Sequence, residues 1–288
     1  MNKLPVISVL MPVYNAEKFV AKTIESVLAQ TMGDFRFYIY DDCSTDGSED
    51  EILRYKDPRI VYKKLAKNGG YVPILNEMLN TCSSEMIARI DSDDICVENR
   101  FETQLSILRD NPKIGLCGSS ATMISDDEIL NGQVWVQPEK HADILFKALT
   151  ENPVIHPSVM LRTEVVKKIG LYNPGFMPSE DLDYWLRASQ FFELHNVRQP
   201  LIYYRHHSGQ ISNRLNQHQA DNAEKIHQAF ITGRLNCPEE KAKRLYNFLK
   251  GVEDLEGKTR NYFVRKAFLS RLPLHTKRLL IRSLLKKR

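Results

Sequence analysis

The chain has 288 residues, of which 42% are hydrophobic and 26% charged, and its formal net charge is +4. This length supports one large core, or one core with a smaller subdomain, and the composition is that of a soluble globular protein. The small net charge gives no sign of a nucleic-acid-binding protein. No apolar run reaches the ~18 residues that a transmembrane helix needs.

The cysteines argue for a reducing compartment. There are five of them, they are scattered, and no C-x-x-C pair occurs. We therefore expect neither a disulfide framework nor a structural zinc site. The first five residues lead directly into an apolar strand, without the long apolar region of a secretory signal. Together these features predict a cytoplasmic protein.

The first 125 residues alternate between strand and helix patterns. Residues 6–11 are a continuous apolar run between two prolines, which predicts a strand buried on both faces. The other predicted strands cover residues 35–40, 59–64, 86–90 and 115–124. The predicted helices cover residues 17–30, a short segment ending near 55, 72–82 and 98–111. Asn15 is the expected N-cap of the first helix. This alternation predicts an α/β fold with an open, mostly parallel central sheet flanked by helices.

The pattern loosens after residue 125. Helices are predicted at residues 141–150, 163–169 and 178–190, the last with Ser179 as its cap. Short strands are predicted at residues 158–161 and 201–204. From about residue 213 onward the sequence predicts a succession of helices.

Three polar clusters follow predicted strands, at residues 12–15, 41–42 and 91–94. Ligands of open α/β sheets bind beyond the carboxyl ends of the strands, so we expect the three clusters to meet at one crevice. In the third cluster, Asp91, Asp93 and Asp94 stand within four residues. Carboxylates this close repel one another, and a divalent cation with oxygen ligands would relieve the repulsion. A solvated acidic turn is the alternative.

Several other residues have both an ordinary and a functional interpretation. Asp42 either caps a turn or accepts the imide N–H of a pyrimidine base, and Tyr14 is either a core aromatic or a platform for that base. Glu180 and Asp181 either compensate a helix dipole or supply a general base. His156 and His207 are either surface histidines or partners of a metal or phosphate.

Five segments in one order resemble the family 2 glycosyltransferases, which have the GT-A fold. They are ISVLMPVYN at residues 7–15, DDCSTDGS at 41–48, ARIDSDD at 88–94, EDLDYW at 180–185 and YRHH at 204–207. The resemblance covers about residues 5–212. It is closest to bacterial enzymes that extend lipooligosaccharide or other surface glycans, which also tend to carry the Asn-Pro-x-x-His pattern found at residues 152–156.

The resemblance implies roles for individual residues. Asp181 would be the catalytic base. Asp93 would bind Mn²⁺ or Mg²⁺, with His207 as a second candidate ligand. His156, Glu180 and His207 would lie near the acceptor or the diphosphate. The residues that would bind the nucleotide-sugar donor are Pro12, Tyr14, Asn15, Asp42, Arg89, Asp91, Ser92 and Asp93.

The implied reaction is an inverting, metal-dependent sugar transfer from a nucleotide-sugar, with UDP as the implied nucleotide. The acceptor would be a hydroxyl of a glycan or of a lipid-linked oligosaccharide, in lipopolysaccharide, lipooligosaccharide or capsule biosynthesis. A non-catalytic nucleotide-sugar-binding or scaffold protein of the same fold is the alternative. A dehydrogenase is not favoured, because the turn after the first strand lacks G-x-G-x-x-G.

Residues 1–212 are expected to form the glycosyltransferase domain. Its first part, residues 1–125, would bind the nucleotide-sugar, and residues 126–212 would carry the acceptor site and the base. Residues 213–288 are expected to form a helical C-terminal region. Its last 18 residues contain seven Lys and Arg and no Asp or Glu. Leucines interleave with these basic residues over 274–288, so this tail either packs on the domain or binds an anionic surface at the inner face of the plasma membrane. The sequence indicates no oligomeric state.

Overall fold

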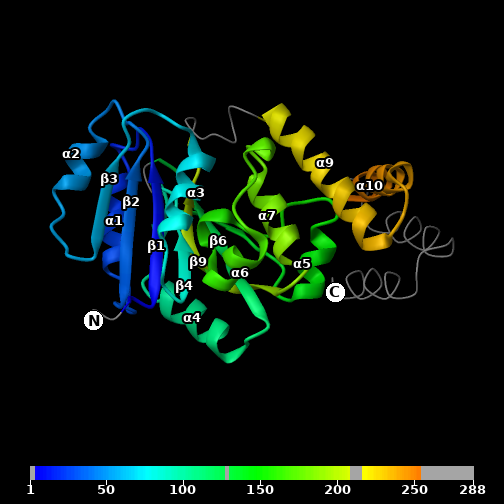
Figure 1. The fold of residues 1–288 in the computed structure, drawn as a ribbon, viewed down its shortest axis with the longest axis horizontal. Coiled ribbons are helices and arrows are strands. Elements are labelled where there is room, and N and C mark those ends of the chain that lie inside the picture. Colours follow the sequence, from blue (N-terminus) through cyan, green and yellow to red (C-terminus); the bar gives the residue numbers. More distant parts are fainter. Residues whose placement is uncertain (1–3, 127–129, 208–215, 254–288) are drawn as a thin grey trace.

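The computed structural model describes residues 4–126, 130–207 and 216–253, and these form a mixed α/β structure (Figure 1). The strands are β1 (Ile7–Val13), β2 (Phe35–Asp41), β3 (Ile60–Lys64), β4 (Met86–Arg89), β5 (Ile95–Cys96), β6 (Ile114–Ile124), β7 (Leu130–Trp135), β8 (Met160–Arg162) and β9 (Glu193–Arg205). The helices are α1 (Val20–Leu28), α2 (Ser48–Leu53), α3 (Tyr71–Thr81), α4 (Arg100–Asp110), α5 (His141–Lys147), α6 (Thr163–Ile169), α7 (Glu180–Ala188), α9 (Asn216–Leu235) and α10 (Glu239–Glu253), with 3₁₀ turns η1 (His156–Ser158) and η2 (Pro174–Phe176).

The strands form one sheet in the order β3-β2-β1-β4-β8-β6-β9-β5, and β7 pairs with β6. Strands β3, β2, β1 and β4 are parallel. Strand β8 is antiparallel to both β4 and β6, so β6 runs in the same direction as β4, and β9 is parallel to β6. The prediction of a mostly parallel sheet flanked by helices is therefore confirmed, with β8 as an antiparallel strand inside it.

Helices cover both faces of the sheet because the central strands are apolar on both sides. All seven residues of β1 are buried. Ile7, Val9 and Met11 pack in one core cluster with α1 and α4, whereas Leu10 packs in a second cluster with α3, α6 and α7. This is the two-residue alternation that a pleated strand imposes on its side chains.

Helices α9 and α10 lie at the opposite end of the molecule from α2 and β3 (Figure 1). Ile226 and Phe230 of α9 pack with Leu182 and Leu186 of α7, which anchors α9 to the main body. Among the described residues, no helix is both long and apolar enough to cross a bilayer. Residues 254–288, including the basic tail, lie outside the described part.

The predicted cap at Asn15 is wrong, whereas Ser179 holds the predicted N-cap position of α7 without a capping hydrogen bond, and each side chain has a distant partner instead. Asn15 lies before the start of α1 with a φ of 50°, and its Oδ1 accepts the backbone N–H of Thr45 at 2.9 Å. The Ser179 hydroxyl donates to the carbonyl of Gln219 at 3.0 Å and makes no hydrogen bond with α7. The sequence also missed β5 and β7, and it predicted only the last part of β9.

The five cysteines are free, as their scattered positions predicted. Cys96 and Cys117 are buried, and burial raises the pKa of both thiols. A buried, protonated thiol behaves as a small apolar side chain, so these two residues serve the core.

Candidate active site

A cleft of about 1090 Å³ opens beyond the carboxyl ends of β1, β2 and β4. The three polar clusters expected to meet at one crevice all contribute to it. Every residue assigned a role from the sequence lines this cleft: Pro12, Tyr14, Asn15, Asp42, Arg89, Asp91, Ser92, Asp93, His156, Glu180, Asp181 and His207. The chain thus brings together side chains that lie up to about two hundred residues apart.

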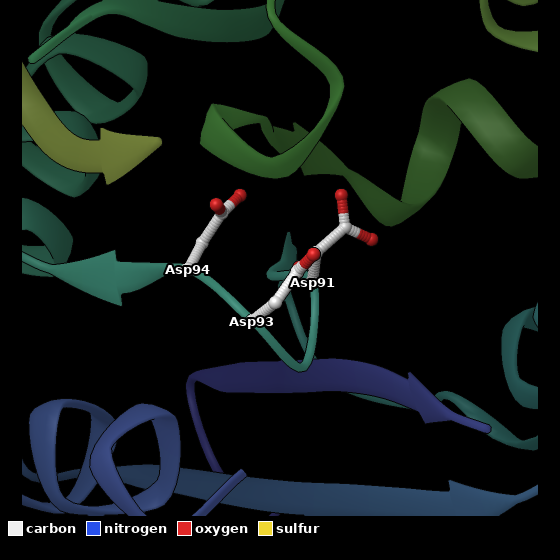
Figure 2. A group of neighbouring side chains, drawn as sticks. All are labelled: Asp91, Asp93 and Asp94. Carbon is white, nitrogen blue, oxygen red and sulfur yellow. The ribbon is translucent and has the colours of Figure 1, made fainter. Parts of the chain in front are cut away.

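The acidic cluster forms the turn between β4 and β5, and Figure 2 shows its three aspartates leaving this turn. Oxygens of Asp91, Asp93 and Asp94 lie within 4.8 Å of one another. The buried hydroxyl of Thr23 fixes the turn from α1, since it lies 3.0 Å from the carbonyl of Ser92 and 2.8 Å from that of Asp94. Three carboxylates at this spacing are suitable ligands for a hard divalent cation.

Each aspartate of the cluster has a different partner. Asp91 pairs with Arg89, and Oδ2 of Asp93 lies 2.9 Å from Nε2 of His207. Oδ1 of Asp94 accepts the backbone N–H of Arg205 at 2.8 Å, which ties the turn to β9. The other oxygen of Asp94 is buried and has no hydrogen-bond partner among the described residues. Burial, followed by the charges of Asp93 and Asp91, raises the pKa of Asp94 well above its usual range.

These features fit a bound cation. A positive charge in the cluster would offset the repulsion that raises the pKa of Asp94, and it would pair with the orphaned oxygen. A carboxylate oxygen and an imidazole nitrogen also suit Mn²⁺, and carboxylates with few other protein ligands suit Mg²⁺. Within the part of the chain that the structure describes, no other group of His, Cys, Asp and Glu has such spacing.

The opposite part of the cleft is formed by the loops after β1 and β2. Tyr14 is 51% exposed at the cleft, so it is not a core aromatic. Asp42 is buried, and its two oxygens accept the N–H groups of Gly69 at 2.7 Å and Gly70 at 2.8 Å. Gly70 has a φ of 85°, a conformation that glycine adopts without steric penalty. Both contacts hold the Asp42 carboxylate in one orientation and leave lone pairs for a further donor.

Glu180 and Asp181 begin α7, and their surroundings separate their chemistry. Asp181 accepts hydrogen bonds from Nδ2 of Asn152 at 2.7 Å and from the N–H of Leu182 at 2.7 Å. Burial raises the pKa of Asp181, and these two donors oppose the rise. Glu180 is 5% exposed, and its Oε2 has no partner among the described residues. Burial, and then the charge of Asp181, raise the pKa of Glu180 to about 8.

The two N–H donors therefore favour the ionised form at Asp181 rather than at Glu180. Two carboxylates side by side resist a second negative charge, so the raised pKa of Glu180 favours a proton on that carboxyl. Asn152 was not assigned a role from the sequence, although it begins the Asn-Pro-x-x-His pattern. That pattern was the available signal for this residue.

His156 is neither a surface histidine nor free to bind a phosphate. Its Nδ1 lies 3.3 Å from the hydroxyl of Tyr71, and its Nε2 lies 3.0 Å from the hydroxyl of Tyr172. Burial, followed by the nearby charge of Arg89, holds its pKa well below the usual range. The imidazole is therefore neutral at physiological pH, and both of its nitrogens are occupied.

Arg205 is a further residue that the sequence did not single out. It is fully buried, its guanidinium lies 4.7 Å from the centre of the Phe19 ring, and its Nε donates to the carbonyl of Asp93 at 2.7 Å. Arg205 therefore supports the acidic turn from β9. Its position in the YRHH segment, next to His207, was the signal that pointed to it.

The profile of glycosyl transferase family 2 matches residues 8–170, which is more than half of the chain. The chain belongs to this family. It is a glycosyltransferase, as the sequence motifs predicted.

Comparisons with individual proteins agree with this assignment. UDP-Glc:alpha-D-GlcNAc-diphosphoundecaprenol beta-1,3-glucosyltransferase WfgD of Escherichia coli is 30% identical over 183 residues, covering 62% of this chain and 68% of that protein. The crystal structure of Staphylococcus aureus TarS 1-349 in complex with UDP-GlcNAc has a TM-score of 0.63 at 16% identity, over 90% of this chain and 78% of that one. Mannosyltransferase PcManGT from Pyrobaculum calidifontis, in complex with GDP-Man and Mn²⁺, has a TM-score of 0.57 at 12% identity, over 99% of this chain and 87% of that one. These likenesses identify the GT-A fold.

The raised pKa of Glu180 predicts a pH-dependent stability. A carboxyl that is more basic in the folded state, with a pKa of about 8 against an ordinary value of 4.5, reduces stability as pH rises through that window. The Glu180→Gln variant has no carboxyl at this position, so its stability does not decrease for this reason as the pH rises. Its melting temperature relative to the wild type should therefore increase between pH 5 and pH 8 and then level off.

Thermal unfolding of both proteins at several pH values measures this difference. Glu164→Gln, at an exposed position of α6, is the matched control and should show a small, constant difference. A difference for Glu180→Gln that stays constant from pH 5 to pH 9 would show that Glu180 is ionised in the folded protein.

Proposed function

We propose that this glycosyltransferase moves a sugar from a UDP-sugar to a hydroxyl group, with a divalent cation and with inversion at the anomeric carbon. The observation that carries the proposal is that one cleft is lined by both the acidic turn and the Glu180–Asp181 pair. The first group suits a diphosphate leaving group with its cation, and the second suits a general base. The reaction needs both at once.

The donor would lie with its nucleotide toward the loops after β1 and β2. The fixed Asp42 carboxylate would accept the N–H of the base, and the exposed ring of Tyr14 would stack on it. Pro12 and Asn15 would complete this side. Asp91 would contact the ribose and the diphosphate, beside Arg89 and Ser92.

A divalent cation at the acidic turn would be held by Asp93 and His207. When bound, it would neutralise the negative charge that develops on the departing nucleoside diphosphate. Mn²⁺ and Mg²⁺ are the ions we propose, because both suit a site of carboxylates and diphosphate oxygens. Support comes from the spacing of the three aspartates and from the Mn²⁺ in the complex of the similar mannosyltransferase.

Asp181 would act on the acceptor. Its carboxylate takes the proton of the acceptor hydroxyl while the oxygen attacks the anomeric carbon, and the bond to the diphosphate breaks on the opposite face. One such displacement inverts the configuration. The hydrogen bond from Asn152 keeps the base oriented and favours its ionised form.

The acceptor we propose is a glycan or a lipid-linked oligosaccharide in surface-polysaccharide biosynthesis. The name of the similar E. coli protein describes a diphosphoundecaprenol-linked acceptor and a UDP-Glc donor, which supports a lipid-linked substrate and UDP here. Thermal-shift measurements with UDP-, GDP- and dTDP-sugars in the presence of Mn²⁺ would identify the nucleotide. Slow release of UDP from a UDP-sugar would then report turnover without an acceptor.

Replacing the proposed base should stop transfer but spare donor binding. Asp181→Asn keeps the shape of the side chain but removes the proton acceptor, and general base catalysis contributes about 10²–10⁴ in rate. We expect a loss of kcat of that order, with nearly unchanged binding of UDP in a calorimetric titration. Asp183→Asn is the control, because Asp183 lies on the same helix and pairs with Arg187 at 2.8 Å. An equal loss of UDP affinity in Asp181→Asn would contradict the assignment.

Removing a proposed metal ligand should weaken the affinity for the cation. We expect EDTA to abolish activity and Mn²⁺ or Mg²⁺ to restore it. Asp93→Ala should then require much more Mn²⁺ for half-maximal activity, because one anionic ligand is gone. Asp110→Ala, at the end of α4, is the control. Activity that is indifferent to EDTA would refute the metal role.

We also propose that the basic tail brings the enzyme to the inner face of the plasma membrane, where a lipid-linked acceptor would be found. Support comes only from the sequence of residues 274–288, and each basic residue near an anionic surface contributes about 1 kcal/mol. The full chain should co-sediment with vesicles that contain anionic lipid, and binding should weaken at high salt. A chain shortened by residues 274–288 should stay in the supernatant, and unchanged sedimentation would refute the proposal.

A further inference from the structure

A row of hydrogen-bonded side chains leads from the acidic turn into the second half of the chain. One terminal nitrogen of Arg89, Nη2, contacts both Asp91 and the hydroxyl of Tyr71. That hydroxyl lies 3.3 Å from Nδ1 of His156, whose Nε2 lies 3.0 Å from the hydroxyl of Tyr172. The row joins β4, α3, η1 and the segment after α6.

A guanidinium only donates, so the Tyr71 oxygen accepts from Arg89. The neutral imidazole of His156 carries one proton, and its tautomer sets the direction of the bonds to Tyr71 and Tyr172. With the proton on Nε2, Tyr71 donates to Nδ1 and Nε2 donates to Tyr172. In either tautomer the imidazole links the two hydroxyl groups.

The far end of the row is fixed by packing. Tyr172 is 5% exposed, and the side-chain amide of Asn76 bonds to both its N–H and its carbonyl, each at 2.9 Å. The centre of the His156 ring lies 5.4 Å from the ring centres of Tyr172 and Trp185. Tyr172 and Trp185 thus fix the position of the His156 imidazole, and the imidazole in turn orients the hydroxyl of Tyr71.

Arg89 has few other side-chain contacts. It is 5% exposed, and its Nε and Nη1 are buried without a hydrogen-bond partner among the described residues. Arg89 lines the same cleft as Glu180 and Asp181, and its charge opposes the raised pKa values of both. This one guanidinium therefore contacts the acidic turn through Asp91 and also acts electrostatically on the Glu180–Asp181 pair.

We propose that Tyr71, His156 and Tyr172 form a positioning unit that holds the Arg89 guanidinium against Asp91, in the wall of the cleft that Glu180 and Asp181 also line. The unit acts through Arg89, whose positive charge favours an ionised carboxylate in the Glu180–Asp181 pair. That carboxylate can then accept one proton. This inference rests on the proposed function, because it assigns Asp181 the role of base.

The test removes single hydroxyl groups. Tyr71→Phe and Tyr172→Phe each keep the ring and break the row, and each should lower kcat by about tenfold or more, the size of a lost hydrogen bond in a network that carries charge. Binding of UDP with Mn²⁺ should change little, because Arg89 keeps its direct contact with Asp91. Tyr184→Phe is the matched control: its ring stacks on Tyr172 with centres 4.2 Å apart, and its buried hydroxyl has no partner among the described residues. It should leave kcat unchanged.

The double variant tests whether the two tyrosines act through His156. If they form one unit, Tyr71→Phe and Tyr172→Phe together should lower kcat about as much as the more damaging single change. If the two losses multiply, the tyrosines act independently and the unit is refuted. A kcat of Tyr71→Phe that matches Tyr184→Phe would also refute it, as would a loss of UDP affinity as large as the loss of kcat.

Failure of the proposed function would look different. In that case the wild-type protein would neither bind UDP with Mn²⁺ nor release UDP from any UDP-sugar. If the wild type is active and only the effects of the tyrosine changes are absent, the positioning unit alone is wrong.

Discussion

The site depends on how the protein accommodates several carboxylates around one buried guanidinium. Asp91, Asp94, Glu180 and Asp181 come from two distant segments. Burial raises the pKa of each of these carboxyls, and the charge of Arg89 opposes the rise. Buried like charges repel strongly, so without a cation the pair at α7 and the turn after β4 would both favour protonation. One positive side chain cannot compensate four negative ones. The remaining repulsion contributes to the raised pKa of Glu180 and underlies the affinity that we propose for a divalent cation.

The fold supplies this arrangement through β8. Its insertion between β4 and β6 places η1 next to the end of β4, and the backbone N–H of Arg89 donates to the carbonyl of Val159 at 2.9 Å. Arg100 of α4 is fully buried and donates from Nη2 to the carbonyls of Arg89 and Val159, at 2.7 and 3.2 Å. The loop that carries His156 is therefore locked to the strand that carries Arg89. Because the two segments lie side by side, the single side chain of Tyr71 is enough to connect Arg89 with His156.

Much of the fold was predictable because it depends on local pattern. The apolar runs of β1 and β4 and the helical spacing of Val20, Ile24 and Val27 follow directly from burial on the two faces of a sheet. Strand β5 has only two residues and no pattern of its own, and its partner β9 lies about one hundred residues later. Strand β7 pairs with the preceding strand β6, but its sequence LNGQVW lacks a strict alternation of apolar and polar residues. The expected capping hydrogen bonds are absent for a related reason. Asn15 and Ser179 have side chains that suit a helix start, but Thr45 and Gln219 provide competing partners that only the tertiary structure brings near.

The site was predictable in membership but not in environment. Motif order brought twelve residues to one cleft, yet residue type alone could not show that His156 is neutral and enclosed by Tyr71 and Tyr172, since these belong to three separate segments. The same holds for the Glu180–Asp181 pair, where the sequence favoured Asp181 only by resemblance. The structure adds a physical reason, because Asp181 has two N–H donors and Glu180 has a buried oxygen without one. Asn152 and the N–H of Leu182 thus distinguish Asp181 from Glu180, whereas the charge of Arg89 acts on both carboxyls and does not select between them.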